Sequence, residues 1–323
     1  MTLRPVLGAD SVENLRILRD LLAGPPGKLE IPPGRHPLAD GLRVPGGWTI
    51  RGASEDDTWL VATERTGHPV LHVLGSDVSI SDLGLRPAPS DPGEHGGDRG
   101  TGLTIGEYLY TEAPEWISGV EVRRVRVDHG DLRTANAIGV MGAVRDIVLR
   151  DVTVTGGYTG LAVHWGAAGA DVATLVGPTY HPHRLDVAGL TVSRAIEGFY
   201  LSSVHDVRVT GASLTDVEMG FRLLPGDNTD RFVSSPEIGS RIEIADVDVT
   251  WSGPLYAVRI AGWGRSEIDG VVTVLTYRDT VIRDCRLTGR GTGNAWSPIV
   301  VEQAAGVKLH SITVASPEQP PEP

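Results

Sequence analysis

Four side chains in the middle of the chain carry groups suited to acid–base chemistry beside an anion. Tyr200 offers a phenol and His164 an imidazole, and each can give or take a proton during a reaction. Arg222 and Arg259 offer guanidinium groups, which bind carboxylates and oxyanions and lower the pKa of a neighbouring phenol. These residue types together favour a reaction in which a proton moves next to an anionic or enolic oxygen.

An internal repeat predicts the elements that position them. The pattern apolar-x-apolar-x-x-apolar-x-apolar occurs eight times, starting at Val78, Val120, Ile147, Leu185, Val207, Ile242, Thr280 and Val307. Each half has period two, which indicates a short strand with one buried face, and the interruption is a corner that often holds Asp. A small-apolar-x-apolar motif follows each copy, as in Gly198–Leu201. The copies start between 22 (Leu185 to Val207) and 42 (Val78 to Val120) residues apart. This irregular spacing, without amphipathic helices in between, predicts a parallel β-solenoid.

The ends of the chain differ from the repeat. Asp10-Ser11-Val12-Glu13 matches a capping box, Leu15, Leu18 and Leu22 share one helical face, and Gly24 and two prolines follow. We therefore predict a helix over 10–23 that caps the first coil, because a solenoid must cover its terminal core. Residues 1–315 are expected to form a single domain, and the proline-rich residues 316–323 a flexible tail.

Composition excludes several classes of function. The net charge is 29 − 41 = −12, which disfavours nucleic acid as a partner. No apolar run is long enough to span a membrane, and no secretory signal is visible, so we expect a cytoplasmic protein without membrane contact. The single cysteine, Cys285, lies at an inward-facing position and is expected to be a buried, unreactive core thiol.

The segment Leu29–Gly34 (LEIPPG), followed by Leu42–Gly52 with its Thr-Ile-Arg-Gly ending, resembles the entry of pectin-lyase-like right-handed parallel β-helices. The resemblance covers nearly the whole chain at the level of fold. It implies an all-β, right-handed parallel β-helix of about eight to ten coils. It also implies that the small-apolar-x-apolar strands form the floor of a cleft. The superfamily includes lyases, hydrolases, epimerases and adhesins, so the fold leaves the activity open.

On such a floor alternate residues face outward, and equivalent positions in neighbouring coils stack about 4.8 Å apart. One predicted outward column contains His72, Thr104, Gly139, Ala162, Tyr200, Arg222, Arg259 and Val300. The next contains Leu74, Gly106, Met141, His164, Ser202, Leu224, Ala261 and Glu302. We predict Tyr200, His164 and Arg222 as catalytic residues and Arg259 as a substrate-binding residue. The alternative is a solvated arginine ladder paired with loop acids such as Glu218, Asp227 or Asp230.

Other predicted substrate contacts lie on the floor and in the loops that wall it. They are Ser202, Met141, Leu224 and Glu302 on the floor, Trp165 and Trp263 in wall loops, and His129 and Asp131 in a segment that resembles part of pectate lyases. The wall loops also hold Tyr108, Tyr110, Trp116, Tyr180 and Tyr277. Such rings can stack on sugars, enclose an apolar molecule, or only hold the loops together.

The signatures of metal-dependent and hydrolytic relatives are largely missing. The strand Asn136–Val140 lacks the acids that a calcium-binding lyase has there. Asp227–Asp230 resembles a polygalacturonase motif, but the expected following strand and a second carboxylate pair are absent from the sequence. His181 and His183 form a possible metal pair without an acidic partner. We therefore predict no metal and no cofactor.

Three functions remain open. The favoured hypothesis is an intracellular, cofactor-independent cyclase, isomerase or lyase, of specialised (natural-product) metabolism. It would act without redox chemistry on a small, partly apolar substrate with an anionic or enolisable group. The alternatives are a polysaccharide lyase or uronate epimerase acting on an acidic glycan, and a non-catalytic glycan-binding β-helix. The negative net charge disfavours an acidic polymer unless the cleft is locally basic.

Overall fold

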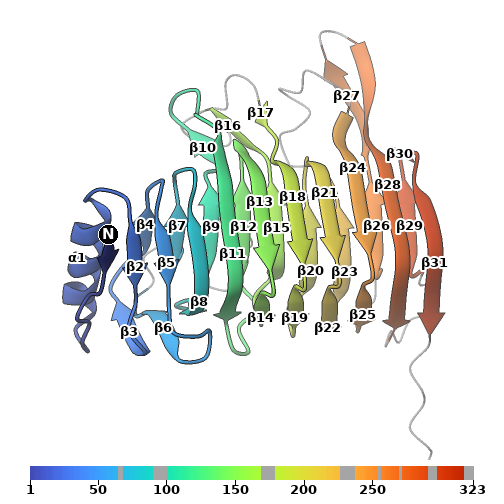
Figure 1. The fold of residues 1–323 in the computed structure, drawn as a ribbon. Coiled ribbons are helices and arrows are strands. Elements are labelled where there is room, and N and C mark those ends of the chain that lie inside the picture. Colours follow the sequence, from blue (N-terminus) through green and yellow to red (C-terminus); the bar gives the residue numbers. More distant parts are fainter. Residues whose placement is uncertain are drawn as a thin grey trace, which may run out of the picture.

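The computed structural model describes residues 1–64, 68–89, 100–168, 179–225, 237–252, 256–268, 271–289 and 297–315. The side chains of 237, 263–268 and 271–273 lie outside the description. One helix, α1 (Ser11–Leu22), precedes a series of strands that stack side by side along the molecule (Figure 1).

Nine parallel strands within the described residues form the sheet that carries the predicted site, here called the floor sheet. They are β4 (Leu42–Val44), β7 (Leu71–Val73), β9 (Leu103–Gly106), β12 (Ile138–Met141), β15 (Thr159–His164), β20 (Glu197–Leu201), β23 (Met219–Leu223), β26 (Val258–Ala261) and β29 (Ile299–Glu302). Their order in space follows their order in the chain, as expected for a solenoid that adds one strand with each coil.

The other sides of the coils form a second, nineteen-stranded network that continues around a corner. Its strands are β1 (Thr2–Leu3), β2 (Lys28–Glu30), β3 (Gly34–Leu38), β5 (Thr49–Arg51), β6 (Thr58–Ala62), β8 (Ser79–Arg86), β11 (Ile117–Asp128), β13 (Val144–Arg150), β14 (Thr153–Thr155), β18 (His183–Ala188), β19 (Thr191–Ser193), β21 (His205–Thr210), β22 (Ser213–Val217), β24 (Glu237–Ala245), β25 (Asp248–Trp251), β27 (Trp263–Ile268), β28 (Val271–Gly289), β30 (Ala304–Ala305) and β31 (Lys308–Ala315). Long strands bridge the corner: β11 pairs in parallel with β13 before it and with β14 after it.

The eight-residue pattern builds the core as predicted. Val125, Val152 and Val247 occupy equivalent positions and are 1% exposed or less. Cys285 shares their position and is 3% exposed, so its predicted burial is confirmed, and burial raises the pKa of its thiol. The corner before these residues has a left-handed backbone, for example at Asp284 (φ 55°). Asp tolerates this conformation, which explains why Asp recurs there.

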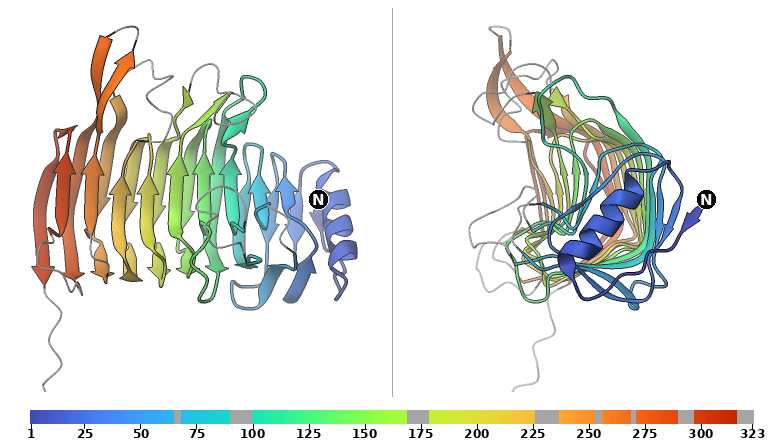
Figure 2. Two further views of the ribbon diagram at one scale, coloured as in Figure 1. Left: turned by 180° about the vertical axis from the view of Figure 1, so that it is seen from behind. Right: turned by 90° about the vertical axis from the view of Figure 1, so that its left-hand side faces the viewer.

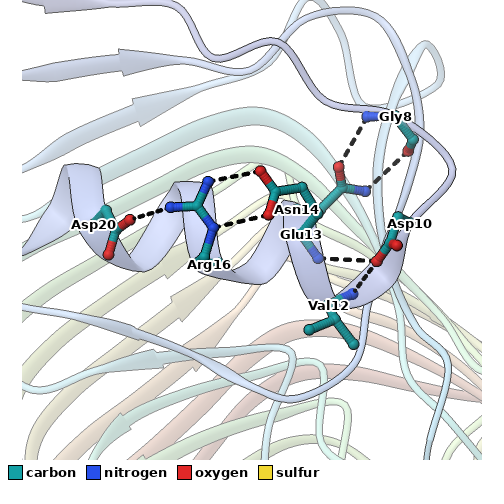
Figure 3. Close-up of polar contacts among 7 residues, drawn as sticks. All are labelled: Gly8, Asp10, Val12, Glu13, Asn14, Arg16 and Asp20. Atoms are coloured by element: carbon teal, nitrogen blue, oxygen red, sulfur yellow. Dashed lines mark hydrogen bonds and ion pairs between the residues drawn. The ribbon is translucent and has the colours of Figure 1, made fainter.

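The predicted helix is present as α1 and lies across the end of the stack (Figure 2). The Asp10 carboxylate accepts hydrogen bonds from the backbone N–H groups of Val12 and Glu13 (Figure 3). The second half of the predicted capping box does not form, because the Glu13 carboxylate binds Arg16 instead. Leu15, Leu18 and Leu22 face the core and are buried.

A small third sheet projects from the loops that follow the floor strands. It consists of β10 (Leu109–Tyr110), β16 (Gly166–Ala168) and β17 (Thr179–Tyr180). Because β10 and β16 come from loops of different coils, this sheet ties neighbouring wall loops together.

Candidate functional site

The strand register confirms the first predicted column of the floor sheet. Ala162 pairs with Tyr200, Tyr200 with Arg222, and Arg222 with Arg259 on successive strands. The register continues to Val300 after Arg259, and through Gly139 and Thr104 to His72 in the other direction. The phenol and the two guanidiniums therefore stand in one row across β20, β23 and β26, as the repeat predicts.

Tyr200 and Arg222 form the centre of this row. The guanidinium carbon of Arg222 lies 4.2 Å from the centroid of the Tyr200 ring, which is a cation–π contact. The guanidinium thus lies over the phenol ring, and the Arg222 side chain keeps 25% of its surface exposed. A cation held in this place can bind an anion that approaches the floor.

Glu197, which sequence reasoning missed, lies buried beneath this stack. Its carboxylate accepts hydrogen bonds from Arg222 Nη2 at 2.8 Å and from Thr159 Oγ1 at 3.2 Å, and the residue is only 3% exposed. Burial raises the pKa of Glu197, although Arg222 and Thr159 act in the opposite direction. The sequence shows only a Glu before Gly198 at the start of a strand, where a solvent-exposed turn residue is the usual interpretation.

Among the described residues, Arg222 pairs with an acid as the alternative interpretation expects, but with Glu197, which that interpretation did not name. Glu218 binds Arg133 at 3.0 Å instead, and Asp227 and Asp230 lie outside the described residues. Arg259 binds Glu302 at 3.1 Å. Both residues were predicted to contact the substrate, and in the structure they form an ion pair with each other.

A cleft of about 610 Å³ opens over this part of the floor. Its lining consists of Tyr200, Arg222, Leu224, Pro225, Arg259, Ala261, Gly262, Glu302 and Gln303. Five predicted site residues, namely Tyr200, Arg222, Arg259, Leu224 and Glu302, are therefore brought together around one space. The lining near the row is polar, with two cations, a phenol and a carboxylate.

His164 stands diagonally beside Tyr200, with 6.0 Å between the ring centroids. Its Nδ1 lies 2.8 Å from the carbonyl oxygen of Trp165, and because a carbonyl only accepts, Nδ1 carries the proton of the neutral ring. The basic lone pair then belongs to Nε2. The ring is held by Trp165 (5.4 Å, stacked) and Tyr108 (4.9 Å, edge-on), so its orientation is fixed by the wall loops.

Several predicted substrate contacts do not reach the cleft surface. Ser202 and Trp165 are 0% exposed, and Met141 and His129 are 3% exposed, so the structure leaves no surface on them for a ligand. Burial is also the main reason that the pKa of His129 falls to about 4. Asp131 is exposed in the segment between β11 and β12, where it binds Arg194 at 3.2 Å. The Trp263 side chain lies outside the description.

The wall aromatics serve mainly to hold the loops. Trp165 packs with Ala167, Tyr108 and Leu109 in a small core of its own. The Tyr110 hydroxyl accepts from the Ala143 N–H at 2.8 Å, and burial raises the pKa of Tyr110 to about 12. These rings are therefore committed to packing, and they are not available to enclose an apolar substrate.

Tyr277 also anchors backbone groups, but from within the main core of the coils. It is fully buried, and its hydroxyl lies 2.8 Å from the Leu201 carbonyl oxygen and accepts from the Ser203 N–H at 3.1 Å. The ring therefore anchors the loop that follows β20.

The described residues contain no group of three or more His, Cys, Asp or Glu side chains arranged to hold a metal ion. His181, which the sequence suggested as half of a metal pair, instead contacts His205, with Nδ1 and Nε2 3.1 Å apart. The polygalacturonase-like segment 227–230 lies outside the described residues. The absence of a metal or cofactor stays a prediction.

No protein-family model and no curated protein sequence matches the chain. Solved structures of distant sequence do share its fold. The enzymatically active domain of tailspike protein 2 from bacteriophage CBA120 has a TM-score of 0.63 at 8% identity, over 95% of this chain and 41% of that one. ORF18 of Geobacillus virus E2 has a TM-score of 0.50 at 11% identity, over 97% and 59% of the two chains. The mannuronan C-5 epimerase AlgE4 A-module of Azotobacter vinelandii matches 98% of this chain and 95% of its own at 13% identity, with a TM-score of 0.44.

The chain has a parallel β-helix fold, as its sequence predicts. It spans less than half of the tailspike chain that it matches. At these identities the likeness extends to the fold, so the activity must be argued from the cleft itself.

Proposed function

We propose that the chain acts on an acidic glycan, as a uronate lyase or epimerase, at the row Tyr200–Arg222–Arg259. The observation that carries the proposal is the Arg222 guanidinium stacked 4.2 Å over the Tyr200 ring, with Arg259 on the next strand. The ring proton beside a uronate carboxylate becomes acidic only when the carboxylate charge is neutralised. Two adjacent guanidiniums beside a phenol supply that neutralisation and a proton carrier together.

The reaction needs one base and one acid. Tyr200 as phenolate, or His164 through Nε2, takes the proton from the carbon next to the carboxylate, and the electron pair moves onto the carboxylate as an enediolate. Arg222 and Arg259 hold this charge. Return of a proton to the opposite face gives the epimer. Departure of the neighbouring glycosidic oxygen, with a proton from the acid, gives an unsaturated sugar and a shortened chain.

The polarity of the cleft favours a glycan over a partly apolar small molecule. The cyclase hypothesis relied on wall aromatics to enclose the substrate, but Trp165, Tyr110 and Tyr277 are buried in loop packing. The cleft lining presents Arg222, Arg259 and other polar groups, which suit hydroxyls and carboxylates, and no aromatic ring besides that of Tyr200 among the described residues. Its apolar part consists of Leu224, Pro225 and Ala261. The glycan alternative therefore replaces the small-molecule cyclase as the preferred interpretation.

Among the described residues, the carboxyl pair Glu197 and Glu302 fits glycoside hydrolysis by two carboxylic acids less well. Glu197 belongs to β20 and Glu302 to β29, three strands apart in the floor sheet. At about 4.8 Å for each strand spacing, this separation is about 14 Å. Paired-acid hydrolysis needs carboxyl groups about 5–9.5 Å apart.

The location of the protein is a separate question. Within the described part of the chain, no helix is sufficiently long and apolar to traverse a bilayer. The cytoplasmic location stays a prediction.

A panel of polymers tests the proposed function. The protein is incubated with polymannuronate, polyguluronate and polygalacturonate, and with neutral cellulose and xylan oligosaccharides as controls. Elimination is followed by ultraviolet absorbance of the new double bond, and epimerisation by NMR detection of deuterium incorporated from D₂O at the carbon beside the carboxylate. Turnover of an acidic polymer alone supports the proposal. Turnover of only neutral glycans overturns it, and binding of acidic polymers without any turnover favours the non-catalytic alternative.

A further inference from the structure

The net charge of the cleft depends on whether the buried carboxyl group of Glu197 is protonated. With Glu197 ionised, the Arg222–Glu197 pair carries no net charge, and Glu302 cancels Arg259 in the same way. A cleft of this kind would attract an acidic ligand poorly, especially on a chain of net charge −12. Protonation of one carboxyl group would make the row cationic without moving any strand.

Glu197 is the carboxyl group that is placed to take this proton. It is 3% exposed, so water screens its charge little, whereas the Glu302 side chain is 53% exposed. One further group acts on Glu197, namely the carboxylate of Glu218, and the charge of Glu197 together with burial raises the pKa of the neighbouring Tyr158 phenol. Glu218 and burial favour the neutral acid, and Arg222 and Thr159 favour the ion. The pKa of Glu197 is therefore set by a balance of opposing effects, in which burial raises it overall.

A bound carboxylate would tip this balance. Arg222 reaches Glu197 through Nη2 and lies over the Tyr200 ring, and its side chain is 25% exposed, so a ligand carboxylate that binds it would be a second anion on one cation. Two carboxylates that share one site do not both stay ionised easily, and the buried one is the more readily protonated. The stack on Tyr200 can persist in both states, so the proton changes the charge of the row while Arg222 keeps its place.

We propose that Glu197 is a proton-linked positioning residue, which holds Arg222 against Tyr200 and takes up one proton when an acidic ligand binds. This inference rests on the proposed function in one respect, namely that the ligand is an acidic glycan. It adds that ligand affinity and proton uptake are coupled through Glu197, and that Arg259 with its exposed partner Glu302 has no such coupling.

Calorimetry measures this coupling directly. Trimannuronate, triguluronate and trigalacturonate are titrated into the protein at one pH in two buffers of different ionisation enthalpy, and the difference in heat gives the protons taken up. Above the pKa of Glu197, we expect up to about one proton per ligand and a Kd that rises by up to about tenfold per pH unit. Glu197→Gln should bind with little proton uptake and a nearly pH-independent Kd.

The matched control is Glu302→Gln, which removes the other carboxyl partner of a floor arginine. It should keep the proton uptake of the wild type. If Glu197→Gln does not fold, Thr159→Val provides a second variant. It removes one hydrogen bond to the ionised carboxylate, so the pH at which affinity falls should move upward. Proton uptake that survives Glu197→Gln, or disappears in Glu302→Gln, overturns the inference.

The outcomes separate this inference from the proposed function. Binding with proton uptake through Glu197, but without turnover, retains the coupling and rejects the proposed reaction. Turnover of an acidic glycan without proton uptake retains the reaction and rejects the coupling. If the protein binds none of the acidic trimers, both the proposed reaction and the proton coupling are rejected.

Discussion

Arginine–carboxylate pairs occur in two regions of this molecule, with opposite electrostatic results. Along a second corner of the coils, just before the repeats that start at Ile147, Leu185, Val207 and Ile242, Arg184 binds Asp146 and Arg241 binds Asp206. Each pair has a shortest contact of 2.5 Å. There the arginines lower the pKa of both Asp carboxyls. On the floor sheet, Arg222 binds Glu197 at 2.8 Å, yet the pKa of Glu197 is raised. The same pair of residue types therefore has a lowered carboxyl pKa in one region and a raised carboxyl pKa in the other.

Burial accounts for the difference. The Asp146 and Asp206 side chains are 45% and 38% exposed, so water stabilises their charge and the arginine adds to it. Glu197 is almost fully enclosed, and the loss of hydration outweighs a single arginine. The corner pairs thus have the character of structural contacts, whereas the floor pair has the perturbed titration that is common at functional sites.

The largest expected effect is a loss of turnover on substitution of Tyr200, which stands on the floor sheet and not at the corner. If its phenol carries the proton, Tyr200→Phe should lower turnover of the acidic glycan by about 10²–10⁴. Stability should change little, because the residue faces outward from the core and retains its ring. Turnover of the variant is compared with the wild type, and circular dichroism melts serve as the control for folding. A variant with nearly full turnover would assign the proton to His164 instead.

Arginines of the two regions should respond differently to the same truncation. Arg222→Ala should reduce turnover by about a hundredfold or more, the scale of losing one group that stabilises developing charge. Arg184→Ala, the matched corner variant, should leave turnover unchanged. Steady-state kinetics on both variants measures the contrast. Equal losses in both, or a loss in Arg222→Ala that follows only from unfolding, would remove the distinction between the two regions.

The positions of these residues could be predicted from the sequence, but their surroundings could not. Strand period and coil repeat fix the row Tyr200–Arg222–Arg259, because parallel stacking leaves little freedom in register. The burial of Ser202 and Trp165 depends on how long loops of different coils pack on one another, which no local pattern encodes. The partner of Arg222 was missed for a related reason. Glu197 is buried by non-local contacts, whereas its sequence context resembles an exposed turn.

The pH dependence of stability provides the finest comparison, and it follows from the directions of the pKa shifts. The pKa of Glu197 is raised above its usual value near 4.5, so between the two values the native state holds more protons than the unfolded state. Stability from this group therefore falls as pH rises through that window. Glu197→Gln cannot titrate, so its stability relative to the wild type should increase as pH rises through the window and then stay constant.

Asp206 should behave in the opposite sense. Its pKa is lowered below the usual 3.8, so its contribution to stability is present above that value and is lost as pH falls through the native pKa. Asp206→Asn should therefore lose stability relative to the wild type as pH rises, by less than about 1 kcal/mol because the pair is exposed to water. Urea denaturation of the three proteins at closely spaced pH values between about 2 and 7 measures both differences. About 1.4 kcal/mol per unit of pKa shift is expected for the buried Glu197, and less for Asp206 because water screens its ion pair. Slopes of the same sign for Glu197→Gln and Asp206→Asn would mean that burial does not separate the floor pair from the corner pair. Slopes of opposite sign would show that the native pKa is raised for Glu197 and lowered for Asp206, so that Glu197 is the carboxyl group that takes up a proton more readily in the folded protein.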